Sequence, residues 1–113
     1  MNSRYYFALD LKDDPALIAE YESHHRAVWP EVIAAIRDSG IVDMQIFRVR
    51  NRLFMAMEVN ENFNPATKAA ADAVNSAVQA WEDLMWKFQQ PLPGSKPGAK
   101  WIPMDIIFDL KDC

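Results

Sequence analysis

Residues 21–32 read YESHHRAVWPEV, and this stretch predicts a helix, a sharp break and a second helix. Pro30 disfavours a helical backbone at Trp29, because the proline ring clashes with that conformation in the preceding residue. The proline itself suits the first position of a new helix, where its missing amide hydrogen is not needed. Tyr21 and His25 are four residues apart and therefore share one face of the first helix. We expect Tyr21, His25 and Trp29 to face a common space.

The chain around this stretch predicts one strand and the two ends of the broken helix. Residues 4–11 alternate between apolar and more polar side chains, as a strand does. Asp14 and Pro15 then supply a helix cap and a first-turn proline. The second helical piece runs from Pro30 to Ser39 and ends at Gly40, which tolerates a left-handed backbone. An apolar stripe marks the buried face of the first piece, formed by Leu17, Ile18, Tyr21, His25 and Val28.

The second half of the chain predicts a β-hairpin, another broken helix and a last strand. Residues 41–50 and 53–59 are rich in β-forming side chains, and Asn51 between them can adopt a positive φ. Asn64-Pro65 starts a helix, which breaks at Asn75-Ser76. Residues 91–98 form a loop by composition, and the alternation over residues 102–110 predicts a strand with one apolar face. The helix after the break has an apolar stripe formed by Val78, Trp81, Leu84, Met85 and Phe88.

The order of these elements, β, broken α, β, β, broken α, β, predicts an α+β fold of the ferredoxin-like βαββαβ type. Its four-stranded antiparallel sheet would carry the helices on one face. The other face would expose Tyr6, Ala8, Phe47, Ile107 and either Ile41 or Val42. An apolar patch of that size usually marks an interface or a ligand cavity. We therefore expect a dimer whose two sheets face each other.

Composition excludes several classes of function. The 113 residues predict one domain over residues 1–113, and half of them are hydrophobic, enough for a real core. The net charge is −4 and the basic residues are scattered, so no nucleic-acid partner is expected. No apolar run approaches the roughly 20 residues that cross a bilayer, which predicts a cytoplasmic protein without a membrane partner. The single cysteine, Cys113, excludes an internal disulfide, and the histidine and cysteine spacing does not suit a zinc site.

One family matches the decisive stretch. The pattern Tyr21-x-x-x-His25-x-x-x-Trp29-Pro30-Glu31, followed by Gly40, the hairpin strands and the helix that begins Val-Gln-Ala-Trp at residue 78, resembles the L-rhamnose mutarotase family. The resemblance implies a homodimeric α/β barrel of ferredoxin-like protomers that needs no cofactor. It also implies a monosaccharide substrate, because the family interconverts the α and β anomers of a 6-deoxy-hexose.

The resemblance also assigns candidate site residues. It places the general acid/base role on His25, a substrate hydrogen bond on Tyr21 and sugar contacts on Trp81. Met44 stands where the rhamnose enzymes carry a tyrosine, and Glu82 stands where they carry a second tryptophan. Both are sugar-contacting positions in that family, so these two residues bear on which sugar fits, L-fucose or L-rhamnose. The ending over residues 101–110 is more similar to the members that act on L-fucose.

The residue types suit this chemistry. Mutarotation removes a proton from the anomeric hydroxyl and adds one to the ring oxygen, after which the ring opens and closes again. An imidazole, with an ordinary pKa of about 6.5, can transfer protons in both directions near neutral pH. Tyr21 can orient that imidazole or donate to a sugar oxygen, and Glu82 can bind hydroxyls or act as a second proton carrier. The indole of Trp81 offers a flat surface for the apolar face of a deoxy sugar.

Other interpretations remain open at this level. His25, Tyr21 and Trp81 lie on apolar stripes and can be ordinary core residues. His24 is rotated by about 100° from His25 and pairs with Glu20, so we expect it on the solvent side. The same barrel architecture also hosts monooxygenases, dehydratases and haem-binding proteins, and fold alone does not fix function. A non-catalytic module that binds a small ligand is a third possibility.

Overall fold

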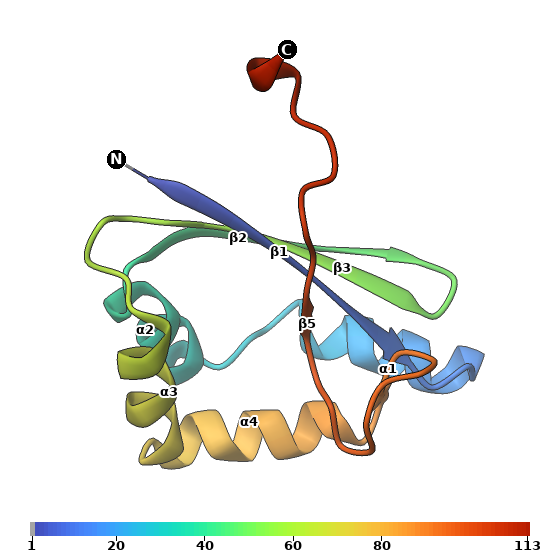
Figure 1. Ribbon diagram of the computed structural model, residues 1–113. Helices are drawn as coiled ribbons and strands as arrows, with labels where there is room; N and C mark the ends of the chain where they lie inside the picture. The colour runs from blue at the N-terminus through green and yellow to red at the C-terminus, as the bar shows by residue number, and fades with distance from the viewer. Residues whose placement is uncertain (1) are drawn as a thin grey trace.

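The computed structural model describes residues 2–113 and consists of an antiparallel sheet with all its α-helices on one side (Figure 1). The first part of the chain forms a strand, two helices and a hairpin: β1 (Ser3–Leu11), α1 (Pro15–His24), α2 (Pro30–Asp38), β2 (Ile41–Val49) and β3 (Arg52–Val59). The remainder contains α3 (Pro65–Ala73), α4 (Ser76–Trp86), β4 (Gln89–Gln90), β5 (Ile102–Pro103) and a short 3-10 helix, η1 (Leu110–Asp112). Within residues 2–113, no helix is long and apolar enough to cross a membrane.

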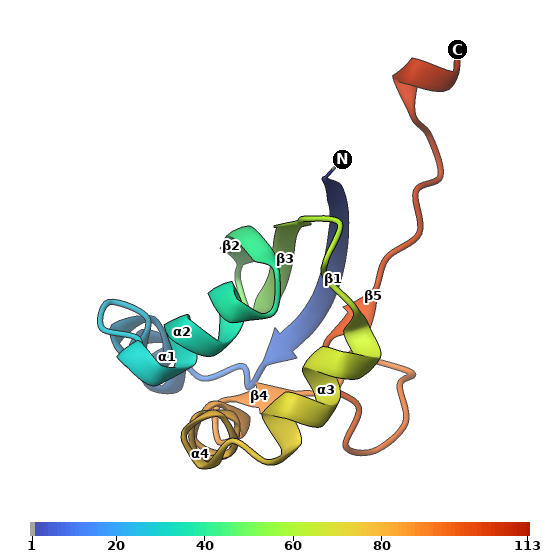
Figure 2. The same cartoon turned by 90° about the vertical axis from the view of Figure 1, so that its left-hand side faces the viewer.

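The sheet has the strand order β2-β3-β1-β4, and β5 also pairs with β1. This is the ferredoxin-like order, so the predicted fold class is confirmed. In register, Tyr6 of β1 faces Ala56 of β3, which in turn faces Gln45 of β2. The two central strands place Phe7, Leu9, Met55 and Met57 in one layer toward the helices, because side chains alternate along a strand. Figure 2 shows α1 to α4 covering this face.

The predicted caps are confirmed and both predicted breaks are present, but α1 ends at His24, so His25 and Val28 lie beyond the helix to which the apolar stripe assigned them. The side chain of Asp14 accepts hydrogen bonds from the amides of Ala16 and Leu17 at the start of α1. Asn64 and Asn75 cap α3 and α4 in the same way. Trp29 has φ −58° and ψ 134°, outside the helical region, and Pro30 begins α2.

The core lies between the sheet and the helices. Leu9, Leu11 and Leu53 of the sheet are fully buried there. A main cluster joins the sheet to the helices and comprises Leu11, Tyr21, Val32, Leu53, Trp81, Met85 and Phe88. A smaller cluster of Ile41, Met57 and Val59 fills the end of the sheet next to α2.

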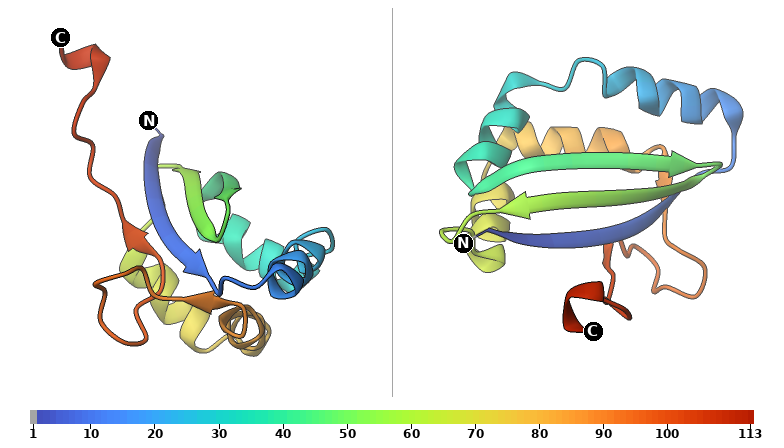
Figure 3. Two further views of the ribbon diagram at one scale, coloured as in Figure 1. Left: turned by 90° about the vertical axis from the view of Figure 1, so that its right-hand side faces the viewer. Right: turned by 90° about the horizontal axis from the view of Figure 1, so that it is seen from above.

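Three predictions about local structure were wrong or incomplete. The predicted strand over residues 102–110 is a strand only at Ile102–Pro103, and the chain beyond it leaves the sheet as an extended tail (Figures 1 and 3). The positive φ in the hairpin, 52°, belongs to Arg50 and not to Asn51. Asn51 instead binds the end of β1, since its side chain donates to the Leu11 oxygen at 3.0 Å and its own oxygen accepts from the Leu11 amide. The two-residue strand β4 was not predicted.

Candidate functional site

A cavity of about 370 Å³ lies between the sheet and the helices, and all five predicted site residues line it. They come from four separate elements or their ends: Tyr21 from α1, His25 from the turn after it, Met44 from β2, and Trp81 and Glu82 from α4. The fold thus brings together positions up to 61 residues apart in the sequence (82 minus 21). Tyr21 and His25 thus share the predicted common space, whereas Trp29, which was predicted to face it as well, does not line the cavity.

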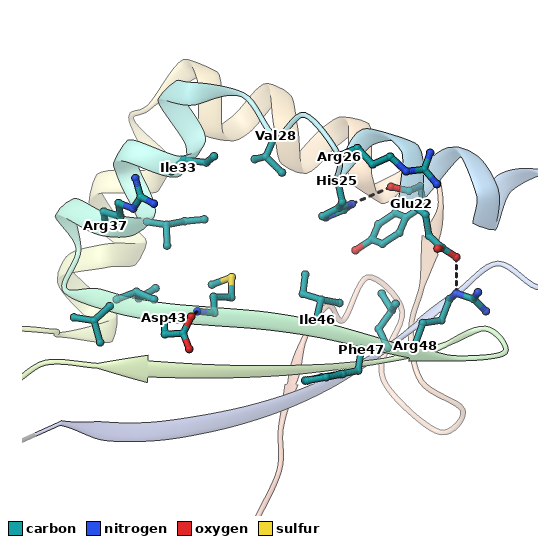
Figure 4. Close-up of a pocket in the computed structure, with 16 residues that line it drawn as sticks. Glu22, His25, Arg26, Val28, Ile33, Arg37, Asp43, Ile46, Phe47 and Arg48 are labelled. Atoms are coloured by element: carbon teal, nitrogen blue, oxygen red, sulfur yellow. Dashed lines mark hydrogen bonds and ion pairs between the residues drawn. The ribbon is translucent and has the colours of Figure 1, made fainter.

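His25 is held by the backbone of the helix it follows. It caps the C-terminus of α1, and its Nδ1 atom lies 2.9 Å from the backbone oxygen of Tyr21 (Figure 4). A carbonyl oxygen only accepts hydrogen bonds, so Nδ1 carries the hydrogen in this contact. In the neutral ring, Nε2 then has the lone pair that can accept a proton. The backbone therefore selects the tautomer in which Nε2 can act as a base.

Tyr21 is almost completely buried, with 3% of its surface exposed. Burial raises the pKa of its phenol to about 12, and a hydrogen bond from Gln89 lowers it only in part. The Nε2 group of Gln89 donates to the phenol oxygen at 3.3 Å. The phenol thus keeps its proton at neutral pH, and because its oxygen accepts from Gln89, the hydroxyl hydrogen can be donated to another acceptor.

The indole side chains of Trp81 and Trp101 line the cavity. The ring of Trp81 lies 5.6 Å from that of His25 and 5.2 Å from that of Trp29, both in edge-to-face geometry. Trp81 is 8% exposed, so it belongs to the core and lines the cavity as well. Trp29 packs against the main core cluster.

A group of charged side chains lies where α3 and α4 line the same cavity. Lys68 and Asp72 form an ion pair between successive turns of α3, and both side chains are largely buried. Gln79 connects this pair to Glu82, because its Nε2 donates to the Asp72 backbone oxygen at 2.9 Å and to the Glu82 carboxylate at 3.3 Å. Glu82 is therefore held in a polar network and is not a freely solvated helix residue.

The sequence did not identify several cavity residues. Lys68 and Asp72 have the i, i+4 spacing of an ion pair, which was a usable signal in an otherwise alanine-rich helix. Gln89, Lys100 and Trp101 come from β4 and from the loop before β5. They carry no periodic pattern, and only the pairing of these segments with β1 brings them to the cavity.

A family model described as L-rhamnose mutarotase matches residues 4–110. The chain belongs to the L-rhamnose mutarotase family. It is 52% identical over 111 residues to an L-fucose mutarotase from Xanthomonas campestris, covering 96% of this chain and 89% of that protein. It is 50% identical over 103 residues to an L-rhamnose mutarotase from Acidiphilium cryptum, covering 91% and 95%.

A solved structure of this family has the same fold. The crystal structure of an L-rhamnose mutarotase from Formosa agariphila superposes with a TM-score of 0.70 at 25% identity, covering 96% of this chain and 98% of that one. The resemblance stated from the decisive stretch is therefore confirmed for the family and the fold. The roles of the individual site residues stay predictions. The cavity geometry adds that all five lie around one space: His25, Tyr21, Met44, Trp81 and Glu82.

Proposed function

We propose that this protein is a sugar mutarotase, an isomerase that interconverts the α and β anomers of a 6-deoxy-hexose, L-fucose or L-rhamnose. The observation that carries the proposal is the fixed tautomer of His25, whose Nδ1 is bound to the Tyr21 oxygen inside a cavity walled by Trp81. Membership of the mutarotase family supports the same conclusion. The chemistry needs no cofactor, because only protons and one C–O bond change.

His25 acts as the base in this reaction. Its Nε2 removes the proton from the anomeric hydroxyl while a second group gives a proton to the ring oxygen, and the bond between C1 and the ring oxygen breaks. The open aldehyde rotates about C1–C2, and closure on the other face returns both protons. Glu82 is suited to be the second proton carrier, and the Tyr21 hydroxyl to hold a sugar oxygen by hydrogen bonding.

L-Fucose is the first substrate to test. A relative with 52% identity is named an L-fucose mutarotase, although another with 50% identity is named an L-rhamnose mutarotase. The two sugars differ in hydroxyl positions, and a buried polar group left without its partner costs about 1–3 kcal/mol. The Met44 side chain offers a sugar hydroxyl no hydrogen bond of that strength, whereas the Glu82 carboxylate does. We infer that Glu82 and Met44 together set the preference between the sugars.

Saturation-transfer proton NMR on the anomeric signals tests this function directly. L-Fucose and L-rhamnose are compared side by side, with catalytic amounts of the protein and without it. We expect faster exchange between anomers with at least one sugar, and the ratio of the two rates measures specificity. A folded sample that accelerates neither sugar contradicts the proposal.

We also propose that the protein is a cytoplasmic homodimer whose two sheets face each other. The face of the sheet opposite the helices carries an aromatic cluster, in which the Phe54 ring lies 5.7 Å from Tyr6 and 5.9 Å from Phe47. Phe47 is 51% exposed in the single chain. A patch of this kind is usually covered in an assembly. Light scattering after size exclusion tests the dimer, and a monomer at working concentration contradicts it.

A further inference from the structure

Helix α3 carries its charged side chains on the side that faces the protein. Its sequence is PATKAAADA, and Lys68 and Asp72 are the two charged residues in it. They form an ion pair, with 22% and 17% of their side chains exposed. Every other residue of this helix is exposed, and most of those residues are alanines. A surface helix normally has the opposite arrangement, with apolar side chains toward the core and charged side chains toward water.

Stability does not account for this inversion. Removing two charges from water costs about as much free energy as their attraction returns, and apolar side chains in their place are often neutral or stabilising. Lysine and aspartate are rarely buried in proteins unless they are paired. A charged pair kept on the inner side of a helix therefore points to a polar ligand. Both residues line the cavity that also contains His25.

The pair lies deeper in the protein than the proposed base. A second, wider hollow of about 850 Å³ lies between β2 and the helices α1 and α2 (Figure 4). Tyr21, His25 and Met44 line both this hollow and the cavity, so they lie where the two spaces meet. Lys68 and Asp72 line the cavity only. The cavity thus has the imidazole toward one end and the charged pair toward the other.

A glutamine fixes the position of the pair relative to α4. The Nε2 group of Gln79 donates one hydrogen bond to the Asp72 backbone oxygen and another to the Glu82 carboxylate. Both hydrogens of the amide are used in these bonds. The helix that carries the pair is therefore held against the helix that carries Trp81 and Glu82 (Figure 2).

We propose that Lys68 and Asp72 bind the C3 and C4 hydroxyls of the sugar and favour L-fucose over L-rhamnose, an inference that rests on the proposed mutarotase site. An ammonium group has three donors and a carboxylate has about four acceptor sites, so their mutual bond leaves both able to bind hydroxyls. One hydroxyl accepts from Lys68, and its neighbour on the ring donates to Asp72. Hydrogen bonds to charged groups are about twice as strong as those between neutral groups.

The geometry of a pyranose ring selects these two hydroxyls. The bond that breaks joins C1 to the ring oxygen, and the C3–C4 bond lies directly opposite it in the ring. A sugar with its anomeric hydroxyl at His25 therefore points C3 and C4 toward the other end of the cavity. Lys68 and Asp72 are four residues apart on one helix face, so they approach the ring from one side. The C3 and C4 hydroxyls lie on the same face of the ring in L-fucose and on opposite faces in L-rhamnose.

Replacing both charges at once tests this site. Lys68→Met with Asp72→Leu leaves no unpaired charge inside the protein, so the urea midpoint should stay the same or rise. We expect the KM for L-fucose in anomer exchange to rise about ten- to hundredfold, the usual worth of a hydrogen bond to a charged group. The preference for L-fucose over L-rhamnose in kcat/KM should fall by at least about tenfold. A folded double variant with an unchanged KM for L-fucose overturns the proposal.

Thr67→Ala is the control for this double variant. Thr67 is an exposed neighbour on the same helix and does not line the cavity. We expect this protein to keep the KM and the sugar preference of the unmodified chain. If Thr67→Ala raises the KM as much as the double variant does, the effect comes from α3 as a whole and the proposal fails.

An L-fucose analogue that lacks the C4 hydroxyl provides a test on the unmodified protein. We expect its KM to be about ten- to hundredfold higher than that of L-fucose. The double variant should treat the two sugars alike, because the groups that bind this hydroxyl are absent. Equal KM values for the two sugars in the unmodified protein overturn the proposal, and so does a double variant that still distinguishes them.

Calorimetry separates this inference from the proposed function. If the unmodified protein exchanges no anomers, the mutarotase proposal fails, and titration with L-fucose still decides whether the pair binds hydroxyls. Binding that the unmodified protein shows and the double variant lacks supports the site. No binding, or equal binding by both proteins, overturns it.

Discussion

The Nδ1 atom of His25 lies 2.9 Å from the backbone oxygen of Tyr21, and the two rings lie 4.5 Å apart. The residue that offers the phenol therefore also fixes the imidazole, through its main chain. Substituting the Tyr21 side chain leaves this carbonyl in place, so the two functions can be separated by mutation. The effects of changing Tyr21 and His25 should differ accordingly.

His25→Ala removes the proposed base. We expect the rate of anomer exchange to fall by about 10²–10⁴-fold, the usual contribution of general acid–base catalysis. His24→Ala is the matched control, because the neighbouring His24 pairs with Glu20 at 3.6 Å and does not line the cavity. Saturation-transfer NMR measures both, with circular dichroism as a check on folding. A folded, fully active His25→Ala protein removes His25 from the mechanism.

Glu82→Gln keeps the shape of the side chain and removes its ability to carry a proton. We expect kcat to fall by about 10²-fold or more if Glu82 exchanges a proton with the sugar. Asp83→Asn is the control, since the adjacent side chain is exposed and absent from the cavity lining. A raised KM with unchanged kcat would show that Glu82 only binds hydroxyl groups.

Tyr21 makes stability depend on alkaline pH. Its pKa is raised to about 12 by burial, against an ordinary value near 10, so the folded chain keeps a proton that the unfolded chain loses first. The contribution of the Tyr21 phenol to the free energy of unfolding is complete below about pH 10 and is lost as the pH rises through 12. The two-unit difference corresponds to about 2.7 kcal/mol. The urea concentration at the unfolding midpoint should drop between about pH 8 and pH 11 in the unmodified protein. We expect a smaller drop in Tyr21→Phe, which lacks this phenol.

Tyrosine absorbance provides an independent check on this assignment. A titration followed at tyrosinate wavelengths should lose its step near pH 12 in Tyr21→Phe, because that phenol is absent. An unchanged step near pH 12 would assign the raised pKa to another group. At neutral pH the same variant leaves the buried Gln89 without its hydroxyl partner, which should cost about 1–3 kcal/mol.

Gly40→Ala should destabilise the junction between α2 and β2. Gly40 has φ +100°, and a Cβ there would lie 2.6 Å from the Asn60 side-chain oxygen and 3.1 Å from the Phe63 amide nitrogen. Gly94 is a matched control with φ +82°, because nothing lies within 4 Å of its Cβ position. Both substitutions strain the backbone by about 1–3 kcal/mol. We expect Gly40→Ala to lower the free energy of unfolding by more, and equal losses would show that the neighbours simply move.

The sequence predicted the parts of this fold that depend on local chemistry. Asp14, Asn64 and Asn75 cap helices through their own side chains, and Pro30 fixes the break at Trp29. These effects act within a few residues, so a single sequence contains them. The five site residues were assigned by the family resemblance, and the structure places all five around one cavity.

The parts that failed depend on distant partners. β4 consists of Gln89 and Gln90 and exists only because β1 lies beside it. Alternation over residues 102–110 predicted a strand, but only Ile102 and Pro103 find a partner strand, which is β1. In the hairpin, Asn51 binds β1 across 40 residues of sequence, and Arg50 takes the positive φ instead.

The end of α1 has a consequence for how the enzyme responds to warming. The amides of His25 and Arg26 are held only by single-turn bonds of 3.1 Å to Glu22 and Ser23, at a helix end where fraying begins. The strands of the sheet, by contrast, are paired on both sides of β1. When that last turn opens, the imidazole loses its fixed tautomer while the rest of the chain stays folded. The rate of anomer exchange should therefore decrease at temperatures where the protein still resists proteolysis.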